Sequence, residues 1–482
     1  MDKTLKIILA TLSTIGTLTI IVILWELAVK PLLISDNNPI PEPTSTITPS
    51  PNSSPSPSDP SLTGIPLEQR FSSGDRRLFT NQNNPNIEQG IAAFKAGNYE
   101  EAYQQFSEAI KTKPINNDPE IQIYLNNSQA RQAGNPFKLA AVVPVDQKQT
   151  NAEEMLRGVA QAQTQFNQKG INGRLLEIVI VNDSNDPNYA QQVAEKIVNN
   201  NDILGVIGHN SSSATVEGLK EYETARIAMI SPTSTSTSLS GNVFFRTVPS
   251  DAKAGQVLAR YAIQNNISNV AVFYTSTSNY SQSLKDAFVN GFQLLGSATV
   301  IDMSLPSFNP KNTVENLQNN VDAFVLFPNT DNKIINLALQ VADANADLSN
   351  PKKLLGGDAL YNPATLKLSK GGVKNLVLAV PWFAKNSYPY TNLAAKRWGG
   401  RVSWRTATSY DATKAFTKAL SENATRNTIL TKLQTTELSS NETSGEPIQF
   451  LKSGDRNTDP LLVRVIPKSS NFAEYDFEII ND

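Results

Sequence analysis

Short apolar runs alternate with helical patterns from residue 137 to about residue 380, and this alternation constrains the fold more than any other feature. Phe137 to Val143 is an apolar run of strand type, and residues 152–169 then carry apolar side chains at helical spacing. Further strands are predicted near residues 175–181, 203–207, 228–230, 270–274, 299–303, 323–327, 353–355 and 376–380. Helices are predicted near residues 189–198, 251–265, 281–295, 331–344, 361–370, 409–422 and 425–434, and late strand-like segments near 449–451, 461–466 and 475–480. The alternation predicts parallel sheets with helices on both faces, in two lobes because one open sheet would be too large.

The composition excludes several kinds of chemistry. The chain has 42 Lys and Arg against 44 Asp and Glu, so it has no basic excess for binding nucleic acid. It has no cysteine, which excludes disulfides, thiolate chemistry, zinc–sulfur sites and a cysteine-linked lipid. Its one histidine, His209, cannot form a cluster of imidazole ligands. We therefore expect no metal ion, no cofactor and no nucleic-acid partner.

An uncharged apolar stretch lies near the amino terminus. Residues 7–24 contain no charged side chain, and Lys3 and Lys6 precede them. A helix of this length can span a bilayer. The following segment lacks the small residues of a signal-peptide cleavage site, and Trp25 suits a helix end at the lipid headgroups. We predict a retained membrane anchor over residues 1–35 in preference to a cleaved signal peptide, with the bulk of the chain outside the cytoplasm.

Residues 36–85 have the composition of a spacer. Most residues between Pro39 and Pro60 are Pro, Ser or Thr. Proline fixes φ and removes a backbone donor, so such a stretch stays extended and forms no core. The low apolar fraction of the whole chain, 39%, is partly explained by this segment.

Residues 86–135 have the pattern of paired helices. Gly97 and Asn98 are expected in the turn between two helices, and small residues lie on either side of Phe106 along one face. The segment resembles a tetratricopeptide repeat, although Asn86 stands where that family has a tryptophan. One and a half repeats cannot bury a continuous core, so the segment either packs on a neighbouring domain as a collar or presents a partner-binding surface.

Two hydroxyl-rich segments directly follow two of the predicted strands. Residues 208–215 read GHNSSSAT, and residues 231–238 read SPTSTSTS. In open α/β sheets ligands bind at the carboxyl ends of strands, where helix amino termini present free N–H groups. Hydroxyls beside these groups form a neutral cradle for a carboxylate or a sugar. Helix capping explains any single serine equally well, whereas two such segments at successive strand ends favour a binding site.

Further motifs accompany these two segments. Residues 181–187 read VNDSNDP, and residues 445–456 contain GEPIQF followed by GDR. In this order, the motifs make residues 137 to about 480 resemble the type I periplasmic binding proteins, in the leucine/isoleucine/valine-binding branch of ABC-transporter receptors. The resemblance implies an α/β fold of two Rossmann-like lobes that are joined by three crossovers and close on a ligand. Within residues 137–482, the first lobe would comprise residues 137–251 and 382–450, and the second lobe residues 252–381 and 451–482.

The resemblance also implies which residues bind the ligand. In this family a serine in the first loop holds the carboxylate of an amino acid, and this position is Ser212. Groups of the second loop also hold it, and these fall on Thr233 and Thr235. An acidic residue of the second lobe, here Asp358, would bind the ammonium group, and Tyr280 would supply an aromatic side chain. From its local context alone, Asp358 would instead be a helix cap.

Several positions depart from the family's pattern. Asn151 stands where an aromatic residue would close over the ligand, and Thr330 replaces a tyrosine that contacts the ammonium group. These changes suggest either a ligand more polar than leucine or a degenerate pocket. Trp382 and Phe383 would either supply replacement apolar wall or pack in the core.

No set of catalytic residues is found. His209 lies beside the first loop, where a lone histidine is expected to hydrogen-bond to neighbouring backbone. The chain has no serine–histidine–acid arrangement, no GxGxxG motif and no GxxxxGK[ST] motif, which disfavours a hydrolase, a dinucleotide enzyme and an ATPase. We therefore expect a protein that is not an enzyme. Asp186 and Pro187 are expected to start a helix.

These features together predict a membrane-anchored, extracytoplasmic solute-binding protein of an ABC-type amino acid uptake system. Two lobes would close on an amino acid or a similar small polar ligand, and the closed form would dock to a permease or a sensor protein. The alternative is a ligand-free or sensory scaffold that uses the lobes and the helical segment for protein–protein contacts, for example in cell-wall synthase regulation. The two hypotheses differ in whether Ser212, Thr235 and Asp358 converge on one cleft with room for a zwitterion.

Overall fold

The computed structural model of the chain describes residues 64–79, 84–369, 371–468 and 474–480. Residues 65–482 form one compact unit. The predicted membrane anchor and most of the predicted spacer lie outside the described residues. Among the residues that are described, no helix combines the length and the apolar character needed to cross a bilayer.

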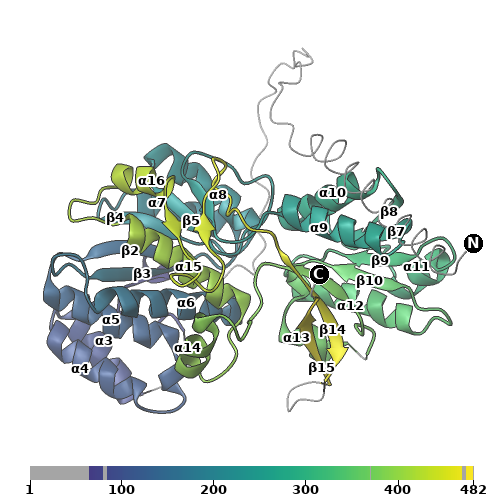
Figure 1. Cartoon of the computed structure of the whole chain (residues 1–482). Coiled ribbons are helices and arrows are strands. Elements are labelled where there is room, and N and C mark those ends of the chain that lie inside the picture. Colours follow the sequence, from purple (N-terminus) through teal and green to yellow (C-terminus); the bar gives the residue numbers. More distant parts are fainter. Residues whose placement is uncertain (1–63, 80–83, 370, 469–473, 481–482) are drawn as a thin grey trace, which may run out of the picture. The chain divides into compact units, whose positions relative to one another are not determined.

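Six strands form the first sheet, in the order β1-β3-β2-β4-β5-β6. They are β1 (Phe71–Ser72), β2 (Phe137–Val143), β3 (Leu176–Asn182), β4 (Ile203–Ile207), β5 (Ala228–Ser231) and β6 (Phe244–Arg246). The sheet is parallel except at β1, which pairs with β3 in the antiparallel direction. Its helices are α6 (Gln149–Asn167), α7 (Pro187–Val198), α8 (Ser212–Ala225), α15 (Trp404–Ala419) and α16 (Arg426–Leu433) (Figure 1). The strands are apolar along nearly their whole length because helices cover this sheet.

Seven strands form the second sheet, in the order β15-β14-β11-β10-β9-β7-β8. They are β7 (Asn269–Tyr274), β8 (Ser297–Asp302), β9 (Ala323–Leu326), β10 (Lys353–Gly356), β11 (Val377–Val380), β14 (Leu461–Pro467) and β15 (Tyr475–Ile479). Its helices are α9 (Asp251–Gln264), α10 (Asn279–Phe292), α11 (Pro310–Leu317), α12 (Asn332–Ala346) and α13 (Pro363–Leu368). Strands β7 to β11 are parallel, while β14 and β15 are antiparallel. The prediction of parallel sheets is therefore correct for the central strands, and antiparallel edge strands make both sheets mixed.

The chain passes between the two sheets three times. It leaves the first sheet after β6, returns after β11 through α14 (Pro389–Trp398), and leaves again between β13 (Ile448–Gln449) and β14. A short strand β12 (Glu437–Leu438) pairs with β13. Apolar residues of α14, α15 and α16 share one hydrophobic core with the first sheet. Each lobe is thus assembled from stretches far apart in the sequence.

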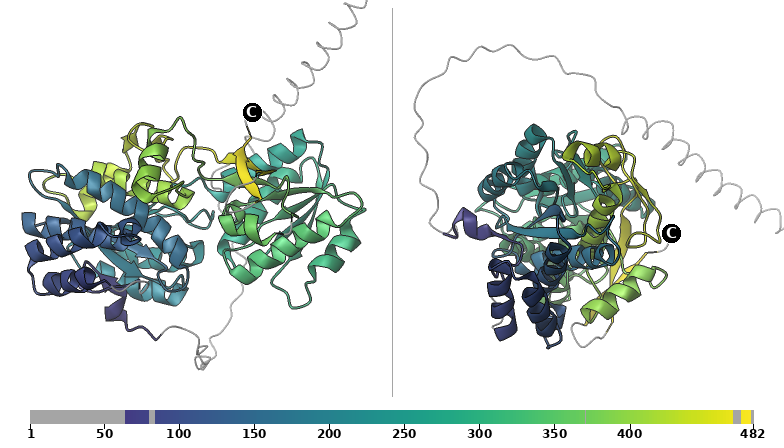
Figure 2. Two further views of the ribbon diagram at one scale, coloured as in Figure 1. Left: turned by 90° about the horizontal axis from the view of Figure 1, so that it is seen from below. Right: turned by 90° about the vertical axis from the view of Figure 1, so that its left-hand side faces the viewer.

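Three α-helices lie between β1 and β2, namely α3 (Pro85–Lys95), α4 (Tyr99–Ile110) and α5 (Pro119–Ala133). Helix α3 packs on α4, α4 on α5, and α5 on α6 and β3, so the segment lies directly against the first lobe (Figure 2). A Cβ at Gly90 would lie 2.6 Å from the ring of Phe106, which explains a glycine at this close approach of α3 and α4. The segment shares the hydrophobic core of the first lobe, as the collar interpretation requires. Its likeness to a tetratricopeptide repeat stays a prediction.

The predicted spacer ends earlier than residue 85, because residues 65–79 belong to the fold. The described part of the chain also contains three short 3-10 helices, η2 (Leu67–Arg70), η3 (Ile115–Asn117) and η4 (Asp358–Leu360). The Tyr124 hydroxyl donates to the Arg76 carbonyl at 2.6 Å, and Glu120 accepts a hydrogen bond from the Leu78 N–H at 2.6 Å. Residues 65–79 are therefore ordered by contacts with the distant helix α5, which leave no local pattern in the sequence.

Candidate ligand-binding cleft

The amino end of α8 forms one wall of the candidate site. Strand β4 ends at Ile207, and the chain then enters α8 at Ser212. The N-cap Ser211 accepts a hydrogen bond from the Ala214 N–H at 3.3 Å, as a serine at this position is expected to do. Ser212 is 3% exposed, and its Oγ accepts from the Ser236 N–H at 3.4 Å. The start of α8 thus presents a buried hydroxyl beside the first-turn N–H groups of a helix.

Thr233 connects the two hydroxyl-rich segments. It follows β5, and its hydroxyl donates to the Asn210 carbonyl at 2.8 Å. Thr235 is also buried, but it does not line the cavity described below. Its carbonyl accepts from the Asp251 N–H at 2.8 Å, where the chain enters the second lobe through α9. Thr233 is therefore at the site, whereas Thr235 lies at the first crossover.

Tyr280 and Asp358 form the opposite wall. The Tyr280 hydroxyl on α10 donates to Asp358 Oδ1 at 2.8 Å, and the Ala359 N–H donates to the same hydroxyl oxygen at 3.3 Å. Asp358 begins η4 just after β10, and Gly357 is the N-cap of that helix. Burial raises the pKa of Asp358, although the Tyr280 hydrogen bond and the charge of Arg405 oppose the shift. Burial and the charges of Asp358 and Asp251 raise the pKa of Tyr280 well above its usual value.

Residues of both lobes line one cavity of about 50 Å³. Four of the five predicted site residues belong to its wall, namely Ser212, Thr233, Tyr280 and Asp358. A wider cleft of about 550 Å³ adjoins it, and Ala359 borders both spaces. The site therefore lies at the carboxyl ends of strands from both sheets, as expected for a ligand site in α/β folds.

The loops of the two lobes also touch each other directly beside this cavity. The Ser213 hydroxyl donates to Asn279 Oδ1 at 3.3 Å. The Thr237 N–H donates to Ser283 Oγ at 2.8 Å. Both hydroxyl-rich segments of the first lobe thus contact α10 of the second lobe, which carries Tyr280.

Two cavity residues, Trp404 and Arg405, were not predicted from the sequence. The expected helix over residues 409–422 in fact begins at Trp404. Ser403 is the N-cap, and a serine before a helical run is a recognised start signal that could have located this end. Arg405 Nη1 donates to Glu154 Oε2 at 3.3 Å, which links α15 to α6 at the edge of the cleft.

The two positions that depart from the family's pattern lie at the site, whereas the two aromatic residues considered as replacement wall do not. Thr330 lines the cavity and Asn151 lines the wider cleft, so both face the site. Trp382 is 2% exposed, and its Nε1 donates to the Ser444 carbonyl at 3.1 Å. Phe383 packs on the core of the second lobe. Of the two roles considered for Trp382 and Phe383, the structure supports packing.

His209 does not bond to neighbouring backbone through its ring, so that prediction is wrong. Its Nδ1 lies 2.7 Å from Asp183 Oδ2, and its Nε2 lies 3.1 Å from the Tyr222 hydroxyl. All three side chains are buried, so the imidazole connects the loop after β3 to helix α8. Within the described residues, no group of three or more His, Asp or Glu side chains is placed to hold a metal ion.

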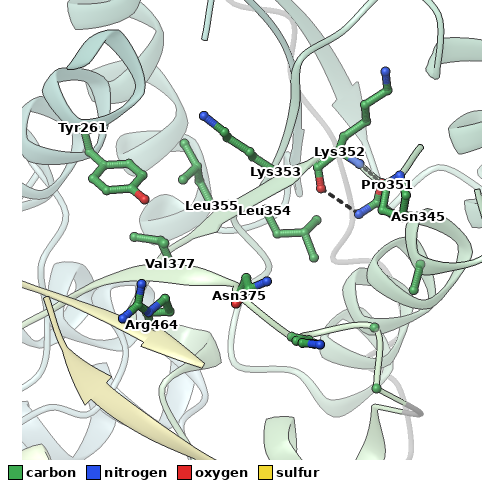
Figure 3. A pocket seen from close by; sticks show the side chains of 14 residues that line it. Tyr261, Asn345, Pro351, Lys352, Lys353, Leu354, Leu355, Asn375, Val377 and Arg464 are labelled. Carbon is green, nitrogen blue, oxygen red and sulfur yellow. Dashed lines mark hydrogen bonds between the residues drawn. The ribbon is translucent and has the colours of Figure 1, made fainter. Parts of the chain in front are cut away.

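A larger hollow of about 620 Å³ lies at the end of the second sheet where β10 and β11 begin, opposite the candidate site (Figure 3). It includes Lys353 at the start of β10, whereas Asp358 follows the end of that strand. Lys353 Nζ donates to the Asn265 carbonyl at 2.7 Å, and Arg464 forms a 3.1 Å ion pair with Glu478. The hollow is therefore distinct from the candidate site, and two of its cations already have partners within the fold.

A family model described as "Periplasmic binding protein" matches residues 139–470. The Leu/Ile/Val-binding protein of Escherichia coli (strain K12) is 32% identical over 153 residues, which cover 31% of this chain and 41% of that protein. The leucine-, isoleucine-, valine-, threonine-, and alanine-binding protein of Pseudomonas aeruginosa is 35% identical over 134 residues, which cover 27% of this chain and 36% of that protein. The matched stretches thus span less than half the length of these curated relatives.

Solved structures have the same fold over a longer range. The leucine-binding protein LivK from Thermotoga maritima matches with a TM-score of 0.62 and 20% identity, covering 71% of this chain and 98% of that protein. LivJ from Streptococcus pneumoniae, solved with isoleucine, matches with a TM-score of 0.60 and 15% identity, covering 72% of this chain and 99% of that protein. The predicted type I periplasmic binding fold is confirmed. Because the family model spans most of its length, this chain belongs to the periplasmic binding protein family.

Proposed function

We propose that this chain is an extracytoplasmic solute-binding protein that closes two lobes on an amino acid or a similar small polar ligand, as the receptor of an ABC-type uptake system. One observation carries the proposal. Hydroxyl groups at the start of α8 and the Tyr280–Asp358 pair of the second lobe line the same cavity. Membership of the family and the likeness to Leu/Ile/Val-binding proteins support it.

The wall formed by the first lobe suits a carboxylate. The Ser212 Oγ accepts only a long hydrogen bond from the Ser236 N–H, so its own proton is available to a ligand oxygen. The Thr233 hydroxyl is occupied by Asn210, but the Thr233 N–H makes only a 3.4 Å contact with Ser231 Oγ. The positive end of the α8 dipole adds to these neutral donors. A carboxylate placed here needs no cationic side chain.

The wall formed by the second lobe suits an ammonium group. Asp358 is 9% exposed, and burial raises its pKa because the charge of Arg405 and the Tyr280 hydrogen bond offset the loss of solvent only in part. A bound ammonium group would stabilise the ionised carboxylate and lower that pKa. Tyr280 holds Oδ1 by a hydrogen bond, which leaves Oδ2 for the ligand. The two walls together fit the two charges of a zwitterion.

Domain closure follows from the way the lobes are connected. Three crossovers join the two sheets, and small rotations at such connections open and close a cleft. We propose that the 50 Å³ cavity and the adjoining 550 Å³ cleft are parts of one binding space whose size depends on this rotation. Closure would exclude water and strengthen the polar contacts to the ligand.

We also propose roles for the remaining parts of the chain. Residues 1–35 would anchor the protein in the membrane, and the proline-rich stretch after them would act as a spacer. The helices α3 to α5 would form a collar on the first lobe, since they share its hydrophobic core. A permease or a sensor protein would recognise the closed lobes. The lobe boundaries at residues 251, 381 and 450 belong to the same proposal. We also propose that the protein binds its ligand without catalysing a reaction.

A ligand-free scaffold is the second candidate, and one observation favours it. The collar adds a helical surface that ligand binding alone does not need, and Tyr103 on α4 is 36% exposed there. In this alternative the lobes and the collar would serve protein–protein contacts, and the cavity would have no ligand.

A thermal-shift screen of the full chain in mild detergent against amino acids, amides and sugars separates the two candidates. A ligand present at about 100 times its dissociation constant adds about 2.7 kcal/mol to the free energy of unfolding. We expect stabilisation by at least one amino acid, and we expect that Ser212→Ala reduces it while leaving the unliganded melting temperature nearly unchanged. The absence of any shift across the panel, with ligand-free protein confirmed by mass spectrometry, would favour the scaffold.

A further inference from the structure

Donor groups without partners are concentrated at the amino end of α15. The N-cap Ser403 makes no capping hydrogen bond through its side chain. Ser403 Oγ, Trp404 Nε1 and Arg405 Nε are all inaccessible to solvent and have no hydrogen-bond partner among the described residues. A buried donor without a partner costs about 1–3 kcal/mol. Of these three residues Trp404 and Arg405 line the cavity and Ser403 does not, so an acceptor bound in the cavity would lie beside the first two.

Arg405 places a fixed positive charge at the same point. It is 6% exposed and lines both the 50 Å³ cavity and the adjoining cleft. Glu154 accepts from Nη1 at 3.3 Å, and this contact leaves Nε, on another edge of the guanidinium, without a partner. The Trp404 ring lies 4.5 Å from the guanidinium carbon and limits its movement. Arg405 is therefore held beside the binding space, where it forms a 3.3 Å ion pair with Glu154, and its enclosed Nε would have to become accessible to reach a ligand.

The helix itself adds to this positive character. Helix α15 runs from Trp404 to Ala419, long enough to have an effective dipole, and its first-turn N–H groups carry the positive end. Trp404 and Arg405 belong to that first turn and also line the cavity. An anionic group beside them would accept hydrogen bonds from the guanidinium and would lie at a favourable end of the dipole.

The charges that line the cavity then define three subsites. Asp358 supplies a negative charge from the second lobe, the start of α8 supplies neutral donors, and Arg405 supplies a positive charge. An amino acid with a neutral side chain would use the first two and leave the Arg405 donor unpaired. An amino acid with a carboxylate in its side chain would use all three.

We propose that the ligand is an acidic amino acid, whose side-chain carboxylate is bound by Arg405 and the amino end of α15. This inference rests on the proposed function, since it assigns the third subsite of the same cleft. Arg405 is then the residue that determines specificity, because it distinguishes a carboxylate from an amide of the same shape. Asn151 and Thr330, polar residues that line the cleft and the cavity, are consistent with a polar ligand.

Isothermal titration calorimetry of the full chain in mild detergent tests the assignment with L-glutamate, L-aspartate, L-glutamine and L-leucine. We expect glutamate or aspartate to bind at least about tenfold more tightly than glutamine and leucine, because a buried charge pair is lost with either neutral ligand. Arg405→Gln should lower the affinity for the acidic ligand by at least about tenfold and change the affinity for glutamine by less than about threefold. Arg464→Gln, which removes an exposed arginine outside the cleft, is the matched control and should change neither affinity.

The outcomes separate this inference from the proposed function. Tight binding of leucine or glutamine by the unaltered protein, with the acidic amino acids weaker or equal, would overturn the inference and leave the proposed function standing. Binding of no amino acid would overturn both. If Arg405→Gln fails to fold, the ratio of glutamate to glutamine affinity in the unaltered protein still decides the question. Arg405→Lys, which keeps the charge, should then retain a preference for the acidic ligand.

Discussion

The hydroxyl of Tyr280 donates to Oδ1 of Asp358 at 2.8 Å and thereby joins α10 to the end of β10. The two residues are far apart in the sequence, yet the pair fixes the orientation of the only carboxylate that lines the cavity among the described residues. A carboxylate held in this way needs no reorientation when a ligand arrives, which lowers the entropic cost of binding.

Asp358→Asn should selectively weaken ligands that carry an amine. The substitution keeps the size of the side chain and removes the charge that we assign to the ligand ammonium group. We expect the affinity for an amino acid ligand to fall at least about tenfold, while the affinity for the matching acid without the amine falls less. Calorimetric titration measures both. Asp347→Asn, at an exposed aspartate that is the C-cap of α12, is the control, and an equal loss for both ligands would remove Asp358 from the ammonium subsite.

Asp251 should make the folded state less stable as the pH rises. It is 1% exposed, and burial together with the charge of Asp358 raises its pKa from 3.8 to about 7, although Thr235, Ser283 and Arg246 oppose the shift. The folded protein therefore keeps this proton over a range in which the unfolded chain releases it, and stability is lost between about pH 4 and pH 7. Asp251→Asn should remove this loss, worth up to about 4 kcal/mol at pH 8.

Chemical denaturation of both proteins at pH 5 and pH 8 measures the effect. Glu120, whose pKa burial also raises to about 7, contributes a slope of the same sign in both proteins, so only the difference between the proteins reports on Asp251. An identical change in stability from pH 5 to pH 8 in the two proteins would contradict the prediction.

Tyr124→Phe should loosen the segment that precedes the collar. The hydroxyl lies 2.8 Å from Ser72 Oγ, 2.6 Å from the Arg76 carbonyl and 2.6 Å from Glu120 Oε1, and its loss leaves these buried groups with fewer partners. We expect a destabilisation of about 1–3 kcal/mol. Limited proteolysis should then cleave within residues 65–79 sooner than in the unaltered protein. Tyr103→Phe, at an exposed position, should leave the digestion pattern unchanged.

Gly158→Ala should separate α6 from α15. A Cβ at residue 158 would lie 2.1 Å from the Thr406 carbonyl oxygen and 2.5 Å from the Tyr410 nitrogen, and backbone atoms cannot yield as a flexible side chain can. We expect a destabilisation of about 1–3 kcal/mol and weaker ligand binding, because α15 carries Arg405. Gly400→Ala meets no atom within 4 Å and is the matched control. Equal melting temperatures for the two variants would show that the helices can adjust.

The parallel strands could be predicted well because their signal is local. Strands β2 and β4 have the predicted bounds, since each is a short, buried apolar run between polar turns. The helix start at Asp186 and Pro187 is confirmed, and the Asp186 carboxylate caps α7 by accepting from the Asn188 and Tyr189 N–H groups at 2.9 and 3.0 Å. Where residue type and local geometry agree in this way, the sequence alone is sufficient to predict where a helix or a strand begins or ends.

The apolar pattern does not reveal the start of α15, for which Ser403 is the available local signal, because the environment of the first turns hides the usual alternation. Thr406 and Thr408 are buried, as is Arg405, so this part of the helix has no polar face to alternate with an apolar one. The same property concealed Arg405 as a site residue, since its burial depends on α6 and on the second lobe. In contrast, Ser212 and Thr233 lie in hydroxyl-rich segments that are recognisable in the sequence as a candidate binding site. Only the fold brings Tyr280 and Asp358 to face them.

The short strand β1 has a consequence for the behaviour of the protein at high concentration. It pairs with β3 at Phe71 and Ser72, opposite Val181 and Ile180, and so covers this part of the outer edge of the first sheet. An uncovered edge strand offers free N–H and C=O groups to a strand of another molecule and promotes aggregation. The segment that precedes the collar thus protects this edge of the sheet against self-association, directly after the proposed membrane anchor and spacer.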